Sequence, residues 1–143
     1  MIRRIPPLLL ALALAACDSP TDPVHALEVN RQIWERHGID DYRFELRAFC
    51  YCRYRDFLAV EVRDGEVVDA RIVESGEVLP QERWREAVTM DQLFEFIRGA
   101  RERGEIDEVR YHPRLGYPLY ADLDNTPDDG GVVYEVVGLH RVD

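Results

Sequence analysis

The chain contains no lysine, so all 18 of its basic residues are arginine, and they stand against 28 acidic residues. The formal net charge of −10 leaves none of the excess positive charge that binding to nucleic acid or to an anionic membrane surface requires. The absence of lysine by itself indicates no particular function. The charge balance therefore argues against nucleic acid as a partner.

Serine, cysteine and long apolar runs are also scarce. The two serines, Ser19 and Ser75, stand in no Gly-x-Ser-x-Gly sequence, so a serine hydrolase is disfavoured. No Cys-x-x-Cys sequence is present, so a thioredoxin-like mechanism has no support. The main apolar run, residues 5–16, has 12 residues, whereas a helix needs about 20 to span a bilayer.

The N-terminus has the pattern of a secretory signal peptide over residues 1–16. Arg3 and Arg4 precede the apolar run, and Leu14-Ala15-Ala16-Cys17 closes it. This closing sequence resembles the bacterial lipobox, which implies diacylglycerol transfer to Cys17 and cleavage before it. The alternative is an ordinary signal peptide with a chance cysteine. Two or three acyl chains on Cys17 would give stable anchoring to a membrane.

Residues 17–23 are interpreted as the lipidated cysteine and a tether, and residues 24–143 as a single domain. Six residues reach at most about 20 Å, so the domain would sit close to the bilayer. Its acidity would be repelled by anionic lipid, which favours a tethered domain over one that lies on the surface. We expect the periplasmic side of the cell envelope, and Asp18 favours the inner membrane.

Periodicity predicts an α+β domain with two helices on one face of an antiparallel sheet of five to six strands. Apolar spacing predicts helices over about 23–37 and 90–103, and Thr89 with Gln92 forms a capping-box pattern before the second. In the segment 74–88, Trp84 and Val88 are candidates for a lid or a short helical turn. Alternating patterns predict strands near 42–50, 57–63, 66–73, 106–112, 119–123 and 132–142.

The hairpin at Asp64-Gly65 allows a prediction of register. The inward-facing candidates on its two arms are all even-numbered: Leu58, Val60, Val62, Val68, Ala70 and Ile72. A three-residue loop over residues 63–65 pairs even-numbered residues of one strand with even-numbered residues of the other, and it places Val60 opposite Val68. We therefore expect a type I turn with Gly65 left-handed in a G1 bulge.

Several motifs together resemble a known family over residues 26–140. They are Trp34…His37-Gly38…Tyr42-Arg43-Phe44, Cys50-Tyr51-Cys52, Val60-x-Val62-x-Asp64-Gly65-x-Val67, Thr89…Leu93-Phe94…Ile97, Val109-x-Tyr111-x-Pro113-x-x-Gly116-Tyr117-Pro118 and Asp124…Asp128-Asp129. They are similar to the bacterial lipoproteins grouped as domain of unknown function 6174. The resemblance implies a secreted or lipid-anchored domain and supplies no activity.

Cys50 and Cys52 are the two thiols that remain once Cys17 carries lipid. In an oxidising compartment we expect a local disulfide between them, although it would be somewhat strained. Thiol exchange, metal binding and free thiols stay open as alternatives. For a metal site, the four histidines are His25, His37, His112 and His140, and His112 is a weak candidate ligand beside the two cysteines.

Two further groups lie late in the chain. Tyr111, Tyr117 and Tyr120 are candidates for a binding surface, because tyrosine combines an apolar ring with a polar end. The oxygens of Asp122, Asp124, Asp128 and Asp129 suit a hard cation, but their spacing does not match a calcium loop, and a solvated turn is the alternative.

These observations favour a lipid-anchored, monomeric, non-enzymatic binding or interaction module of the cell envelope, without a cofactor and with an envelope protein as partner. The main alternative is a redox-active or metal-handling protein that uses Cys50 and Cys52. A hydrolase built on His112 and the aspartates is a weaker third.

Overall fold

The computed structural model describes residues 23–49, 57–123 and 131–142, and it has the predicted α+β architecture. Six strands, two α-helices and one 3₁₀-helix follow one another along this described part of the chain. Their order is α1 (Pro23–His37), β1 (Tyr42–Phe49), β2 (Leu58–Arg63), β3 (Glu66–Ile72), η1 (Gln81–Glu86), α2 (Met90–Arg103), β4 (Glu108–Tyr111), β5 (Pro118–Asp122) and β6 (Val133–Arg141).

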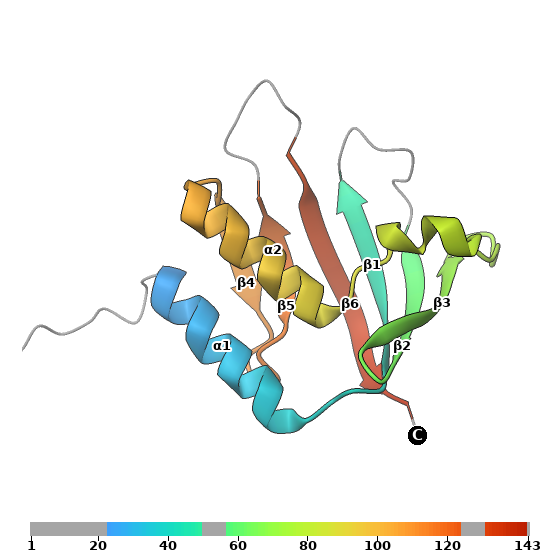
Figure 1. Cartoon of the computed structure of the whole chain (residues 1–143), viewed down its shortest axis with the longest axis horizontal. Helices are drawn as coiled ribbons and strands as arrows, with labels where there is room; N and C mark the ends of the chain where they lie inside the picture. The colour runs from blue at the N-terminus through green and yellow to red at the C-terminus, as the bar shows by residue number, and fades with distance from the viewer. Residues whose placement is uncertain (1–22, 50–56, 124–130, 143) are drawn as a thin grey trace, which may run out of the picture.

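All six strands form one antiparallel sheet in the order β3-β2-β1-β6-β5-β4. The last strand, β6, lies between β1 and β5, so it joins the hairpins of the first half of the domain to those of the second. Both α-helices lie in front of one face of this sheet (Figure 1), as the sequence predicted. The opposite face carries no helix of the described part of the chain.

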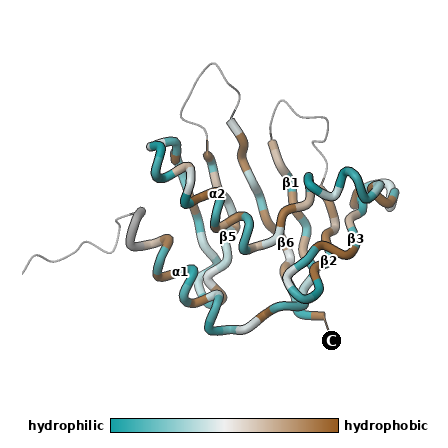
Figure 2. The backbone as a smooth tube through the Cα atoms, viewed as in Figure 1, coloured by the Kyte–Doolittle hydropathy of each residue, from teal (hydrophilic) through white to brown (hydrophobic). Residues whose placement is uncertain are grey.

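The core lies between the sheet and the helices, because each strand sends alternate side chains to that side. On β1, Tyr42, Phe44 and Leu46 are buried, whereas the residues between them face outward. The helices contribute an apolar stripe to the same core, seen as alternating brown and teal along α1 and α2 (Figure 2). Its largest fully buried side chains include Phe94, Leu27, Leu46, Met90, Leu93 and Ile97.

Both predicted helices are confirmed with their boundaries. The hydroxyl of Thr89 accepts a hydrogen bond from Gln92 N–H, and the Gln92 side chain accepts one from Thr89 N–H, which completes the capping box. Gly104 ends α2 in the left-handed conformation, with φ of 74°. None of the helices in the described ranges is long and apolar enough to cross a membrane.

The β2–β3 register differs from the prediction. Asp64 and Gly65 both have positive φ, 48° and 75°, so they form a two-residue type I′ turn rather than a three-residue loop. Val62 therefore pairs with Val67, and the register shifts by one residue immediately beyond that pair. The extra residue lies in the strand, where Val68 is 43% exposed, instead of in the turn.

This shift restores the inward pattern for the rest of the hairpin. Val60 lies opposite Ala70 and Leu58 opposite Ile72, so even-numbered residues meet on the core face. The prediction required even-numbered residues of the two strands to lie opposite each other. A bulge in the strand meets this requirement as well as a bulge in the turn does.

The segment 74–88 runs along the outer edge of β3. Arg71 forms an isolated bridge with Val78, and Leu79 N–H donates to the Ala70 carbonyl at 2.8 Å. The indole of Trp84 in η1 donates to the Leu79 carbonyl at 2.9 Å. The predicted short helical turn is therefore η1, and it holds a segment that covers one edge of the sheet.

Candidate functional site

The uncovered face of the sheet is built from the outward-facing residues of its strands, and these are mainly arginines and carboxylates. Ion pairs between described residues on this face include Arg43–Glu61 at 2.7 Å, Arg63–Glu61 at 2.9 Å, Arg71–Asp69 at 2.6 Å, Arg47–Glu135 at 2.6 Å and Arg110–Glu108 at 3.0 Å. Exposed pairs of this kind add little stability, at most about 1 kcal/mol each. Their main effect here is that the face stays polar and needs no covering layer.

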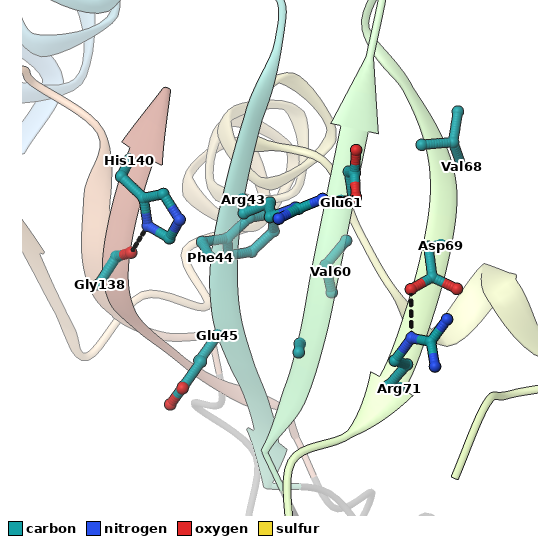
Figure 3. Close-up of a pocket in the computed structure, with 11 residues that line it drawn as sticks. Arg43, Phe44, Glu45, Val60, Glu61, Val68, Asp69, Arg71, Gly138 and His140 are labelled. Carbon is teal, nitrogen blue, oxygen red and sulfur yellow. Dashed lines mark hydrogen bonds and ion pairs between the residues drawn. The ribbon is translucent and has the colours of Figure 1, made fainter. Parts of the chain in front are cut away.

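A depression of about 680 Å³ opens on this face across β3, β2, β1 and β6 (Figure 3). Two rows of paired residues cross it from strand to strand. The first row is His140, Arg43, Glu61 and Asp69, and the second is Val137, Glu45, Ala59 and Arg71. Residues of both rows line the depression, and in the second row the short side chain of Ala59 leaves a gap between the longer side chains of Glu45 and Arg71.

Glu45 and Arg71 carry opposite charges on the two sides of this gap. They are two strands apart, so their Cα atoms are separated by about 10 Å. Arg71 pairs with Asp69 instead, through its Nε at 2.6 Å. Glu45 forms no ion pair with any residue that the structure describes. The depression therefore presents a carboxylate on one side and a guanidinium on the other.

The first row holds its groups more tightly. Glu61 accepts hydrogen bonds from Arg63 at 2.9 Å and from Arg43 at 2.8 Å, and these two arginines lower the pKa of its carboxyl. Arg43 remains 53% exposed and Arg71 50% exposed. A guanidinium has five N–H donors, so each of these arginines keeps donors for a ligand.

His140 stands at the β6 end of the first row. Its Nδ1–H donates to the Gly138 carbonyl at 2.8 Å, which leaves Nε2 as an acceptor in the neutral ring. Gly138 has no side chain and so keeps the hollow open on this side. The described lining contains no serine, threonine, cysteine or lysine, and its charged and titratable side chains are arginines, carboxylates and one histidine.

The structure separates the three tyrosines predicted to form one binding surface. Tyr117 is only 4% exposed and packs against Trp34, with ring centroids 6.0 Å apart. Tyr111 stacks on Phe94 on the helix side of the sheet, at 6.3 Å. Tyr120 alone lies on the uncovered face. The three tyrosines therefore do not share one exposed surface in the structure, because Tyr111 and Tyr117 pack on the helix side of the sheet and Tyr120 lies on the other side.

His112, the weak candidate metal ligand, has a structural role. Its Nδ1 accepts hydrogen bonds from Leu115 N–H at 3.0 Å and from Arg114 N–H at 3.3 Å, and its ring stacks on Tyr117 at 4.9 Å. It therefore stabilises the turn that leads into β5. In the described part of the chain, no three His, Cys, Asp or Glu side chains gather in a way that would hold a metal ion.

The remaining predicted sites lie outside the described residues. These are the lipidation site Cys17, the pair Cys50 and Cys52, and the loop aspartates Asp124, Asp128 and Asp129. The disulfide, redox and metal interpretations of the cysteine pair therefore stay predictions.

The sequence interpretation missed the residues of the depression. Alternation on β1 already placed Arg43 and Glu45 on the outer side of that strand. What was missing was the position of β6 beside β1, which brings in Gly138 and His140 from almost 100 residues away in sequence. A systematic reading of the outward positions of neighbouring strands would have found Arg43, Glu45 and Arg71.

Comparison with known proteins supports the resemblance drawn from the motifs. A family model described as a family of unknown function, DUF6174, matches residues 26–141, which is most of the chain. No curated protein and no solved structure matches the sequence. By this match, the chain belongs to the family of unknown function DUF6174.

Proposed function

We propose that this protein is a lipid-anchored binding domain of the cell envelope, and that the uncovered sheet face binds a segment of an envelope protein that carries charges of both signs. The observation that carries the binding role is the depression, with Arg43 and Arg71 exposed and Glu45 without an ion-pair partner among the described residues. The described lining contains no serine, threonine, cysteine or lysine, and the role that we propose is non-enzymatic.

The anchor is supported by the N-terminal sequence and by where the domain begins. Leu14-Ala15-Ala16-Cys17 resembles a lipobox, and α1 starts six residues after the cysteine, at Pro23. With a tether of at most about 20 Å, the domain would stay near the membrane on the periplasmic side. Asp18 favours the inner membrane.

The mixed charge of the face determines the kind of partner. Carboxylates would bind at Arg43 and Arg71, because arginine recognises carboxylate groups with paired N–H donors. A lysine or arginine side chain would bind at Glu45. A segment with charges of only one sign would meet like charges at one of these positions, which costs affinity. The preferred partner is therefore a polypeptide segment in which both signs occur.

Binding of synthetic peptides to the purified full-length protein at physiological ionic strength tests this proposal. The probes are three ten-residue peptides: one alternating Glu and Lys, one rich in Glu and one rich in Lys. We expect the alternating peptide to bind best. The Arg43→Glu, Arg71→Glu double variant should bind it about tenfold more weakly or worse, a loss of about 1.4 kcal/mol.

The matched control is the Arg36→Glu, Arg85→Glu double variant. It changes the net charge by the same amount at two exposed arginines that do not line the depression. This control should bind the alternating peptide as the wild type does. Equal losses in the two double variants, or no preference among the three peptides, would contradict the proposed binding face.

The alternative based on Cys50 and Cys52 stays a prediction, because both residues lie outside the described part of the chain.

A further inference from the structure

A second pocket, of about 490 Å³, opens on the helix side of the molecule, away from the charged face. It lies between the first turns of α1, the end of α2 and strand β4. The start of α1 and the end of α2 are on the same side of the molecule, in front of β4 (Figure 1). Its lining is Ala26, Leu27, Ile97, Arg101, Gly104, Ile106, Asp107, Glu108, Val109 and Tyr111.

The walls of this pocket are mainly apolar. Leu27 and Ile97 belong to the buried core, and Ile106, Val109 and Tyr111 pack against it. Burial raises the pKa of the Tyr111 phenol, so this ring stays neutral under physiological conditions. Asp107 and Glu108 are exposed. The pocket therefore suits a hydrocarbon chain whose polar end stays in solvent.

The length of chain before α1 identifies which hydrocarbon chain can reach this pocket. Two of the lining residues, Ala26 and Leu27, come three and four positions after the first residue of α1, Pro23. At 1.5 Å per residue, Leu27 is only about 6 Å along the helix. Cys17 is six residues before Pro23, and six residues extend at most about 20 Å. A lipid on Cys17 is thus tethered within reach of the pocket.

Tethering also favours this occupant over a free lipid. A short flexible linker gives a group an effective concentration in the millimolar range at its own domain. A free fatty acid would have to compete with that concentration from solution or from the bilayer. The occupant that the chain itself supplies is therefore the favoured one.

We propose that the pocket between α1, α2 and β4 takes one acyl chain of the lipid on Cys17, an inference that rests on the proposed lipid anchor. Moving this acyl chain from the bilayer into the pocket costs little hydrophobic free energy, because the acyl chain is shielded from water in both places. The other acyl chains would stay in the membrane. If the lipid has two acyl chains, only one then stays in the bilayer, and the anchoring becomes easier to reverse, since a single chain holds a protein only marginally.

Photocrosslinking of the full-length protein in its own membranes tests this inference. Cells that produce the protein are fed palmitate with a diazirine near the middle of its chain, and the membranes are irradiated. Because the chain lacks lysine, trypsin cuts only after arginine and releases residues 104–110 as one peptide. We expect mass spectrometry to find the lipid-bearing Cys17 peptide crosslinked to this peptide, which contains Ile106 and Val109.

Two substitutions on α1 form a matched pair. Ala26→Phe places a ring in the pocket, whereas Val29→Phe enlarges a residue of the same helix that is 37% exposed and does not line the pocket. The crosslink to residues 104–110 should fall about fivefold or more in Ala26→Phe, because the ring takes the volume that the chain needs. It should persist in Val29→Phe. Ile106→Asp, which adds a charge to the wall, gives a second variant if Ala26→Phe fails to fold.

The outcomes separate this inference from the proposed anchor. If Cys17 takes up the palmitate but the crosslinks join it only to membrane lipids, the anchor stands and the pocket inference is wrong. The same holds if blocking the pocket leaves the crosslink to residues 104–110 unchanged. If Cys17 takes up no palmitate, both the anchor and the inference are overturned.

Discussion

The hydroxyl of Tyr42 on β1 accepts a hydrogen bond from the backbone N–H of Met90, the first residue of α2, at 3.0 Å. The first N–H groups of a helix have no partner inside the helix, so they need one from elsewhere. The capping box satisfies two donors at this end, and Tyr42 satisfies a third. Both residues are buried, at 2% and 0% exposure. This bond fixes where α2 begins over the sheet.

Replacing Tyr42 with phenylalanine keeps the ring and removes the acceptor. The Met90 N–H is then buried without a partner, and we expect the free energy of unfolding to fall by about 1–3 kcal/mol. Urea unfolding measures this loss. Tyr120→Phe is the control. The Tyr120 hydroxyl, on the uncovered face, donates only a long hydrogen bond of 3.5 Å to Asp122, so its loss should cost under about 0.5 kcal/mol. Equal costs would mean that the Tyr42 bond contributes nothing specific.

A second prediction concerns Gly116, in the turn between β4 and β5. Its φ is 77°, and a Cβ there would overlap the Asn30 carbonyl oxygen and lie 2.9 Å from the Ile33 Cβ on α1. We expect Gly116→Ala to cost about 2 kcal/mol or more, because strain in the left-handed region adds to displacement of α1. Thermal and urea unfolding measure this cost.

Gly76→Ala separates these two causes. Gly76 has a similar φ of 70°, but a Cβ there would meet nothing within 4 Å. This variant should therefore show the backbone strain alone, about 1 kcal/mol. If Gly116→Ala is no more destabilising than Gly76→Ala, the close approach of the turn to α1 is not important for stability.

The sequence predicts the elements of this fold well because their signals are local. The capping box at Thr89, the glycine after α2 and the alternation on β1 are each contained within a few residues. The order of the strands is not local. The pairing of β1 with β6 joins residues about 90 positions apart, and no periodicity within either strand specifies it.

The candidate site was harder to predict for the same reason. The depression depends on the side-by-side placement of Glu45, Ala59 and Arg71 from three strands, and hence on their register. The β2–β3 register could not be deduced, because a bulge in the turn and a bulge in the strand satisfy the same apolar pattern. Tyr117 looked like a surface residue, but its position depends on how the turn packs under α1.

Another prediction is that acid reduces the stability that the ion pairs of Glu61 give to the folded protein. Its pKa is lower in the folded protein than its ordinary value, chiefly because Arg63 and then Arg43 donate hydrogen bonds to it. The stabilisation is present above the unfolded-state pKa of about 4.3, and it is lost as the pH falls through the lower folded-state pKa. Glu61→Gln should thus be less stable than the wild type at pH 7, by up to about 1 kcal/mol, and this difference should shrink as the pH falls below the unfolded-state pKa.

Glu45→Gln is the matched control for this pH effect. Glu45 lies on the same face, but it has no ion pair with a described residue. Unfolding curves at several pH values should show a smaller pH-dependent difference for this variant than for Glu61→Gln. The opposite ranking would contradict the role of the two arginines.

The proposed anchor predicts the behaviour of Cys17→Ser. Without the thiol no lipid can be attached, so we expect an uncleaved precursor that takes up no labelled palmitate. Cys52→Ser should be labelled and processed as the wild type is. Normal cleavage of Cys17→Ser, together with release of the wild type without detergent, would show that the lipoprotein interpretation is wrong.

The last prediction is that a bond between Cys50 and Cys52 is not essential to the fold. The described residues on either side of this segment already hold its ends together. The Arg47 guanidinium lies 4.3 Å from the centroids of both Phe49 and Phe57, and Glu135 accepts its Nη2–H at 2.6 Å. Each cation–π contact contributes about 0.5–1 kcal/mol at a partly exposed site. Pairing of Leu46 with Leu58 then closes the β1–β2 connection from within the sheet.

A disulfide between Cys50 and Cys52 should add little further stability to the folded protein. The ring between positions 50 and 52 is so short that its entropic gain is well below the roughly 3 kcal/mol expected for a 15-residue loop. A Cys50→Ser, Cys52→Ser double variant should therefore fold, reach the membrane and melt only slightly below the wild type. Arg47→Ala should lower the melting temperature more, because it removes both ring contacts and the ion pair. An unfolded double variant would show that the cysteine pair is buried core or a structural metal site.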